Sequence, residues 1–429
     1  MKKIFIITLT LTLVFLSDLT AQRLSSSPFS RYGVGDLFFQ GNGRQIAMGN
    51  TGIADFNSAY ISKLNPASVS ALKPNSVIFE VGTFHKLSFY NNGFEKQTNN
   101  ITNFKQVTCG FRINNWWHTS FGLAPYSGVG YRIITYDTLN IDDEFQTSII
   151  SDYDGKGGIN QLFWGNSFTL FNHFSVGANI NYNFGSIDRN TKTILTDTLY
   201  SSFTSLTTTS NRNIFKKVNV DFGFIYADTI KKDDYNNLLS FSAGAIFTNN
   251  YDINVTQTRY VSRSTSVYDR TFTDSIYLDT VSNSLIGIPR TIGFGTSLCF
   301  YNKLTISGDY IVRNWSKSSI LGETNFVNSS FIGLGAEFVN DPYSSTYFKT
   351  IRYRLGAFQN NSYMLYNDQQ IVTQALTFGL GFPIKTVQLN LGFVIGKTGS
   401  IDLGLQENFY EFNMNVSLYD LWFVKRKFM

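Results

Sequence analysis

Strict alternation between apolar and polar residues is the feature that most limits the fold of this chain. In SVGANINYNFG, residues 175–185, apolar side chains fall on one face of an extended strand, and Asn179, Asn181 and Asn183 fall on the other. The same period of two recurs in VNVDFGFIY, VQLNLGFVIG and FNMNVSL. A repeat at every second residue predicts β-strands that have one apolar and one polar face.

The polar faces of these strands are rich in asparagine, serine and glycine. Charged residues make up only 15% of the chain and aromatic residues 16%, whereas a soluble domain carries roughly a quarter charged residues. A soluble β-sandwich would also alternate, but its exposed face would be rich in lysine and glutamate. We therefore expect an all-β transmembrane antiparallel barrel, in which the apolar face of each strand meets lipid and the polar face meets the lumen.

The alternation predicts about fourteen strands of the length that a tilted membrane strand needs. Their approximate spans are 76–90, 104–113, 118–131, 158–170, 174–187, 213–228, 238–250, 289–300, 303–313, 329–340, 350–360, 371–383, 386–396 and 408–420. Long links at 132–157, 188–212 and 251–288 alternate with short turns such as NNWW and FNH. This is the pattern of long surface loops and short periplasmic turns, and it places both chain ends in the periplasm.

The chain divides into three predicted parts. Residues 1–21 combine two lysines, an apolar stretch and a small residue, Ala21, which indicates a secretory signal, with an uncleaved anchor as the alternative. Residues 22–75 are neither charged enough for a disordered tail nor periodic enough for strands. We expect them to form an amino-terminal hatch that plugs the lumen, because a barrel of this size, residues 76–429, would otherwise be open. The predicted location is the outer membrane of a Gram-negative-type cell.

Several classes of function receive little support. The net charge of +5 is scattered along the chain, so we expect no nucleic-acid partner. Cys109 and Cys299 lie in separate predicted strands and have no metal-ligand spacing, so we expect no disulfide, metal or cofactor. A barrel lipase would need a serine–histidine pair. His85 has no recognisable serine motif nearby, and His118 and His173 lie in predicted periplasmic turns, away from the outer leaflet. We therefore do not expect an enzyme.

Two short motifs precede the first predicted strand: RQIAMG, residues 44–49, and LNPAS, residues 64–68. With the exported start, the hatch and the fourteen strands, they resemble the FadL family of outer-membrane transporters of long-chain fatty acids and other hydrophobic compounds. The segment SSSPFSRYGVGDL departs from the family pattern, which indicates a divergent branch. The resemblance implies a ligand bound in the lumen and a sideways exit through the barrel wall.

By position, the resemblance also implies a hatch motif. Its residues are Arg44, Met48, Gly49, Asn65, Pro66 and Ala67. The Asn-Pro-Ala turn either lies near the ligand path and takes part in gating, or only holds the hatch in place.

Some positions predicted to face the lumen are apolar. They either line a ligand pocket or pack against the hatch. These candidate ligand-lining residues are Ile78, Phe84, Phe163, Ile225, Ile246 and Phe358.

The third predicted strand contains Pro125 together with Gly122, Gly128 and Gly130. Proline cannot donate a ladder hydrogen bond and is normally confined to edges and bulges. These four residues are candidates for a lateral portal, and the resembled family has its opening at the third strand. The alternative is a strand end followed by an extracellular turn.

The predicted function is therefore transport of hydrophobic compounds, with a hydrophobic small molecule and outer-membrane lipid as partners. The alternative is a docking or shuttle partner in protein secretion, similar to a FadL-like component of the type IX system. That role would use a protein partner at the surface loops.

Overall fold

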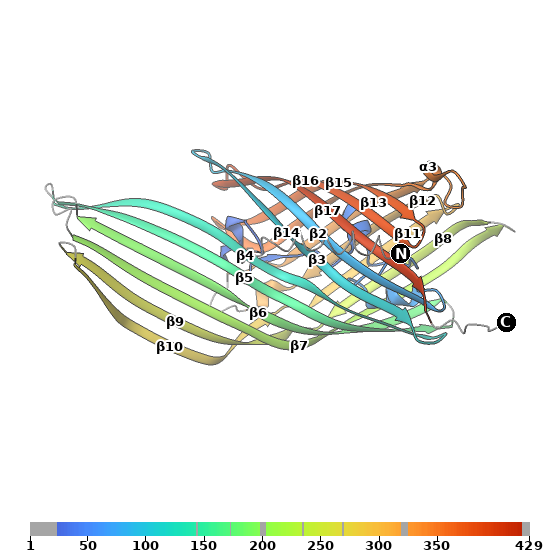
Figure 1. Ribbon diagram of the computed structural model, residues 1–429, viewed down its shortest axis with the longest axis horizontal. Coiled ribbons are helices and arrows are strands. Elements are labelled where there is room, and N and C mark those ends of the chain that lie inside the picture. Colours follow the sequence, from blue (N-terminus) through green and yellow to red (C-terminus); the bar gives the residue numbers. More distant parts are fainter. Residues whose placement is uncertain are drawn as a thin grey trace, which may run out of the picture.

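The computed structural model describes residues 24–142, 145–171, 173–197, 203–233, 236–267, 270–318 and 325–422. The predicted signal at 1–21 lies outside these ranges. Fourteen antiparallel strands form a closed barrel, as predicted (Figure 1). They are β2 (Ser76–Asn91), β3 (Lys96–Arg112), β4 (Trp117–Asp142), β5 (Phe145–Leu170), β6 (Phe174–Asp197), β7 (Phe203–Asp233), β8 (Asn236–Thr248), β11 (Thr291–Phe300), β12 (Leu304–Arg313), β13 (Ser329–Val339), β14 (Arg352–Tyr366), β15 (Gln369–Ile384), β16 (Val387–Ser400) and β17 (Leu405–Leu421).

The ring closes where the last strand meets the first. β17 pairs with β2 from Gln406↔Asn91 to Leu421↔Ser76. β8 pairs directly with β11, so β9 (Tyr251–Val267) and β10 (Arg270–Ile288) are not among the strands that close the ring. These two strands form a hairpin, and β9 pairs with the first half of β7.

The three long links expected to be surface loops are largely β-structure, so that expectation is wrong. β4 and β5 stay paired through 132–142 and 145–157, and β6 and β7 stay paired through most of the described part of 188–212. Link 251–288 is the β9–β10 hairpin. Threonine, isoleucine and tyrosine are frequent in these segments and favour cross-strand pairing. The result is a sheet of β4–β7, β9 and β10 that projects beyond the rest of the barrel (Figure 1).

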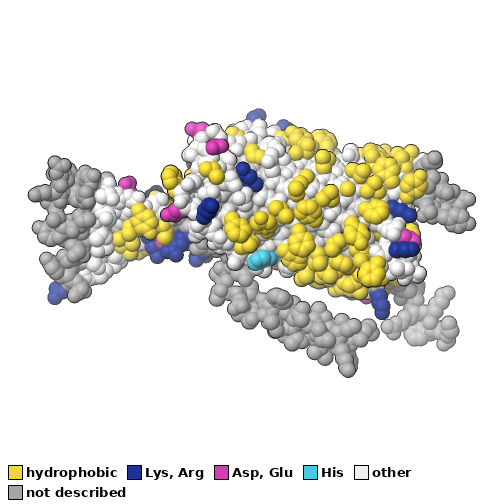
Figure 2. Space-filling view, turned by 90° about the horizontal axis from the view of Figure 1, so that it is seen from above, with side chains coloured by type: hydrophobic (Ala, Val, Ile, Leu, Met, Phe, Trp, Pro, Cys, Tyr) yellow, Lys and Arg dark blue, Asp and Glu magenta, His cyan; other side chains and the backbone are white. Residues whose placement is uncertain are grey.

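The outer wall carries an apolar belt. Leu355, Phe378, Phe393 and Phe412 are directly opposite one another across four strands. On β16, the outward residues are apolar from Val387 to Ile395, a span of about 27 Å along the strand and about 21 Å vertically at a 40° tilt. On the face drawn in Figure 2, hydrophobic side chains gather over the body of the molecule and are fewer over the described part of the projecting end. This is the surface of a membrane-spanning barrel.

Residues 24–75 contact the inward faces of opposite walls. Their elements are η1 (Pro28–Arg31), β1 (Asp36–Leu37), α2 (Gly43–Ala47) and η2 (Pro66–Ala71). η1 and β1 contact β4, α2 contacts β14–β17, and η2 contacts β3–β7. The segment therefore lies within the ring (Figure 1). The remaining short elements are η3 (Trp315–Lys317) and α3 (Tyr347–Thr350).

The inward asparagines of β6 face protein and not open water. Asn179 Nδ2 donates to the carbonyl of Lys63 at 3.0 Å, and Asn181 Nδ2 donates to Asp221 Oδ2 at 2.7 Å. These N–H donors avoid the penalty of losing water, whereas Asn181 Oδ1 has no partner in the described part of the chain. Cys109 and Cys299 are free thiols. Among the described residues, no helix has the length and apolarity to cross a membrane.

Candidate functional site

The Asn-Pro-Ala turn is fully enclosed. Asn65 is the N-cap of η2, and its Oδ1 accepts from the Ala67 amide at 3.0 Å. Its Nδ2 donates to the carbonyls of Ile53 at 2.7 Å and Phe224 at 3.2 Å. Pro66 occupies the first helical position, where a missing N–H is harmless. Ser167 Oγ of β5 donates to the carbonyl of Ala67 at 3.1 Å. The turn is thus tied both to the inner segment and to the wall.

Glycines in the wall make this close approach possible. A Cβ at Gly223 would lie 2.0 Å from Asn65 Oδ1, and one at Gly177 would lie 2.6 Å from the Ala67 nitrogen. No side chain larger than hydrogen fits at such distances. The inward glycines of β6 and β7 therefore form the seat of the Asn-Pro-Ala turn.

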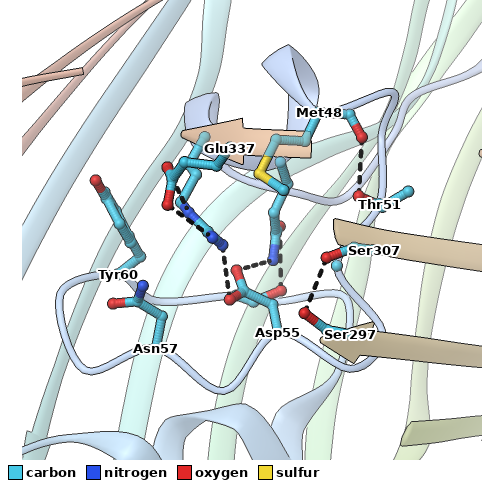
Figure 3. A network of polar contacts seen from close by, with 12 residues as sticks. Met48, Thr51, Asp55, Asn57, Tyr60, Ser297, Ser307 and Glu337 are labelled. Carbon is cyan, nitrogen blue, oxygen red and sulfur yellow. Dashed lines mark hydrogen bonds and ion pairs between the residues drawn. The ribbon is translucent and has the colours of Figure 1, made fainter. Parts of the chain in front are cut away.

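Arg44 joins α2 to the neighbouring wall at β13 and β14. The Glu337 carboxylate on β13 accepts from Arg44 Nε at 3.0 Å and from Arg354 Nε at 2.6 Å. Arg352 Nη1 is 3.4 Å from the same carboxylate, and Arg44 Nη1 also donates to Asp55 at 2.8 Å. Figure 3 shows Glu337 and Asp55 on either side of one guanidinium. Burial lowers the pKa of Arg44, but Asp55 and Glu337 more than offset it, so the net shift is upward.

Met48 and Gly49 lie against a second pair of wall glycines, Gly335 and Gly356. Met48 is buried, and its carbonyl accepts from Thr51 Oγ1 at 2.8 Å (Figure 3). Gly49 has φ +66°, and its nitrogen would lie 2.2 Å from a Cβ at Gly356. Its amide also donates to Thr377 Oγ1 at 2.9 Å. A glycine is required here by both the backbone conformation and the close approach.

The wall is interrupted between β3 and β4. Their pairing runs from Arg112↔His118 to Val107↔Leu123, and no pairing between these strands continues past Leu123 in the described residues. Beyond this point β3 still pairs with β2, and β4 still pairs with β5. The β4–β5 register shifts between Pro125 and Ser127. The break begins directly before the proline, which has no N–H to donate.

Residues near the amino terminus cover this break from inside. Asp36 and Leu37 of β1 pair with Gly128 and Ser127. Gln40 Nε2 donates to the carbonyl of Pro125 at 2.9 Å. The amide of Gly130 donates to Ser30 Oγ at 3.0 Å.

Gly122 lies on the other side of the break and behaves differently. A Cβ there would lie 2.4 Å from the carbonyl of Val107 and 2.9 Å from the Phe163 ring. Gly122 thus lies close against β3, one residue before the last β3–β4 pair. The structure brings Pro125, Gly128 and Gly130 together along the inner segment and leaves Gly122 in the paired part of the wall.

A cavity of about 240 Å³ lies in the lumen beside the break. Phe38, Phe84, Phe331 and Phe358 provide apolar surface. Charged groups also reach it: Asp36, Lys86, Lys105, Arg313, Glu407 and Glu411. The cavity is therefore amphipathic, with aromatic walls and ionisable side chains.

Two cations of this cavity have no counter-ion within 4 Å in the described part of the chain. They are Lys105 and Arg313, whereas Lys86 pairs with Glu407 at 2.7 Å. Lys105 is the extra residue of a bulge on β3, opposite Gly82 and Thr83. Its Nζ lies 5.5 Å from the centroid of Phe84 and 5.9 Å from that of Phe38.

Asp36 is the ionisable group of β1. Ser25 Oγ donates to its carboxylate at 2.6 Å. Burial raises the pKa of Asp36 from 3.8 to about 6, although the bond from Ser25 and the charge of Lys86 oppose this shift. A titrating group is thus part of the segment that covers the break.

The six candidate ligand-lining residues divide into two groups. Phe84 and Phe358 line the cavity. Ile78 packs in a cluster with Ile61, and Ile246 packs with Ile53. Phe163 and Ile225 also lie outside the cavity lining. The centroid of the Phe163 ring is 5.7 Å from Lys63 Nζ of the inner segment, and Ile225 is fully buried in the wall.

Sequence reasoning missed the cations of the cavity and the partners of Arg44. Lys105 carries a weak signal, since it sits within a strand otherwise read as alternating. Glu337 and Arg354 occupy inward positions of apolar, glycine-rich strands, where charge is unusual. Their pairing with a residue near the amino terminus has no signal in a single sequence.

Solved structures with a similar fold are known. One of them is the toluene transporter TodX of Pseudomonas putida, which is 14% identical to this chain. The match covers 90% of this chain and 100% of that chain, with a TM-score of 0.59. The monoaromatic hydrocarbon channel CymD shows 11% identity, coverage of 89% and 98%, and a TM-score of 0.57. A FadL homologue of Pseudomonas aeruginosa shows 11% identity, coverage of 91% and 100%, and a TM-score of 0.53.

At these identities the likeness concerns the fold. A comparison with curated protein sequences finds no match. A family model described as BamG matches residues 1–429. The chain therefore belongs to the BamG family.

Proposed function

We propose that this protein transports hydrophobic compounds with a long-chain, fatty-acid-like character across the outer membrane of a Gram-negative-type cell. The ligand binds in the lumen and leaves sideways through the barrel wall. One observation carries the proposal: the amphipathic cavity is lined by Lys105 of β3, which lies beyond the last β3–β4 pair, and by Asp36 and Leu37 of β1, which pair with β4 at the break. The similar fold of channels for toluene and monoaromatic hydrocarbons supports it.

The chemistry of the cavity supports a ligand with an apolar chain and an anionic end. Phe84 and Phe358 offer apolar contact. Lys105 and Arg313 are cations enclosed by the barrel and without a close counter-ion in the described residues. A charge removed from water without a partner is unfavourable. A ligand carboxylate would supply the missing negative charge.

The inner segment divides into an anchored and a movable part in this proposal. Residues 42–71 plug the lumen and are held by the Arg44–Glu337 pair and the enclosed Asn65–Ala67 turn. We therefore assign the Asn-Pro-Ala turn to anchoring. β1 pairs with β4 at two positions, at the portal candidate Gly128 and at the neighbouring Ser127, and the Phe38 amide donates to the carbonyl of Tyr126 at 3.0 Å beside them. Its release would connect the cavity to the break beside Pro125.

A disulfide between β1 and β4 tests this route. Leu37 and Ser127 are register partners, and directly opposite residues have Cα atoms about 4.5–5.5 Å apart, within disulfide range. Leu37→Cys with Ser127→Cys is made in a background of Cys109→Ser and Cys299→Ser. Uptake of radiolabelled oleate into a deletion strain is measured with the bond oxidised and reduced.

We expect uptake to stop on oxidation and return on reduction. A matched pair joins the anchored part to the wall, Ala67→Cys with Ser167→Cys, and should leave uptake unchanged in both states. Normal uptake with β1 locked to β4 would refute the lateral route.

Arg313→Gln tests the anionic end of the ligand. It removes the cation but keeps most of the side chain. We expect uptake of oleate to fall about tenfold or more, since a hydrogen bond to a charged group contributes about 1.5–3 kcal/mol, and uptake of toluene to stay the same. An equal loss for both compounds would instead indicate damage to the cavity.

A second candidate function is docking of a secretion partner. The observation that favours it is the projecting sheet, whose outer edges, β4 beyond Gly128 and β10, have no further strand partner in the described pairings. Open edges can accept a strand from another protein. Comparing oleate uptake and the exported-protein profile of a deletion strain separates the two functions. Lost secretion with normal uptake would favour docking.

A further inference from the structure

A polar row crosses the outer wall just above the apolar belt. Gln359 is opposite Gln374, Gln374 is opposite Lys397, and Lys397 is opposite Asn408. Gln374 Nε2 donates to Gln359 Oε1 at 3.0 Å. Lys397 is exposed and has no ion pair within 4 Å among the described residues. One cation thus lies among neutral amides on the lipid side of the barrel.

The row directly below is apolar and contains a gap. It runs across five strands as Leu334, Ala357, Leu376, Ile395 and Tyr410, each opposite the next. Four of these side chains are large, and Ala357 is small. Along β14 the outward residues are Leu355 of the belt, then Ala357, then Gln359, so the apolar row lies between the belt and the polar row.

Together the two rows line a groove of about 640 Å³ on the outer face of the barrel. Leu334, Leu376 and Ile395 form its apolar sides, and Lys397 stands at its upper end. The ladders between β13 and β17 are continuous beneath it. The backbone of these strands therefore stands between the groove and the lumen, with Phe358 and Phe409 lining both the groove and the lumen cavity, and the groove opens on the lipid side of the barrel.

We propose that this groove binds an anionic glycerophospholipid, with one acyl chain over Ala357 and the phosphate at Lys397. The occupant must come from the membrane, because the groove opens in the apolar belt. A lysine at the upper limit of the belt is at headgroup depth, where it attracts anionic lipid. The amide groups of Gln374 and Asn408 beside it can donate to phosphate oxygens. This site does not depend on the proposed transport function.

The test uses the full chain in nanodiscs made of equal parts phosphatidylglycerol and phosphatidylcholine. Lipid retained after release from the nanodisc is measured by native mass spectrometry. We expect phosphatidylglycerol to be retained in preference to phosphatidylcholine. Lys397→Gln should reduce retained phosphatidylglycerol about fivefold, since one lysine near a membrane surface contributes about a factor of five in affinity. Ala357→Phe, which fills the gap, should reduce retention of both lipids.

Two matched variants serve as controls. Lys385→Gln removes an exposed lysine in the turn between β15 and β16, at the opposite end of the belt. Ala178→Phe adds the same ring to an outward position of β6. Both should retain lipid like the parent chain, and heat-modified migration in gels verifies that each barrel is folded.

Three results would overturn the proposal. They are equal retention of the two lipids by the parent chain, an equal loss in Lys385→Gln and Lys397→Gln, and unchanged retention in Ala357→Phe. If added lipid A displaces phosphatidylglycerol from the parent chain but not from Lys397→Gln, the site belongs to a glycolipid and the stated occupant is wrong.

Discussion

Replacing Glu337 with glutamine removes the negative charge that joins three arginines. Its carboxylate accepts two bonds from Arg44, one from Arg354 and one from Arg352, at 2.6–3.4 Å. The side chains of Arg44 and Arg354 are 4% and 0% exposed. Removing one partner of a buried ion pair costs about 3–5 kcal/mol, because the remaining charge is buried and unpaired.

This loss should act on the inner segment more than on the barrel ladders. Arg44 keeps only Asp55 as a counter-ion, and α2 has no other ion pair to the wall in the described residues. We expect the free energy of opening for residues 42–53, measured by hydrogen exchange, to fall by about 3–5 kcal/mol. Exchange within β15–β17 should change little, since their backbone ladders stay intact.

Asp152→Asn provides the matched control. It also removes one carboxylate from an arginine pair, but Arg132 is 59% exposed, and exposed pairs contribute about 0–1 kcal/mol. Its exchange pattern should match that of the parent chain. Unchanged protection of residues 42–53 in Glu337→Gln would refute the view that this charge holds the inner segment in place.

Two further predictions concern the inner segment. Gly223→Ala places a methyl group 2.0 Å from Asn65 Oδ1, so we expect the free energy of unfolding, measured by thermal unfolding, to fall by about 1–3 kcal/mol. Gly308→Ala, which has more room at its outward position, should change it little. Equal effects of the two substitutions would contradict the packing argument. The pKa of Asp36 is raised from 3.8 to about 6 by burial, so the docked state of β1 should lose stability as pH rises through this window. A fluorophore on Leu37→Cys in a background without other cysteines should report this change, and Asp36→Asn should abolish it; a pH response that survives Asp36→Asn would assign it to another group.

The barrel itself could be predicted from single segments. From Val387 to Ile395 the sequence predicts side chains that point alternately outward and inward, and the barrel wall shows the same alternation, because alternation depends only on local strand geometry. Strand ends were less predictable. The segments beyond Arg132 and Asp188 lack the apolar face that lipid imposes, so they were expected to be loops. Their pairing with neighbours extends the strands instead.

The site depended on contacts that local patterns do not encode. The Asn-Pro-Ala turn was recognisable, but its seat on Gly177 and Gly223 required the fold to bring them together. Lys105 enters the cavity because a bulge changes which face it occupies, and bulge positions depend on register with β2.

The sequence by itself determined the class of fold, the number of barrel strands and the early segment that lies apart from them. Only the tertiary structure decided that Arg44 meets Glu337, 293 residues away, that β1 covers the gap beside Pro125, and that five strands align their side chains into a groove. The physical reason is that alternation is a property of each strand alone. Charge pairing, close packing and grooves depend on which strands become neighbours and in which register.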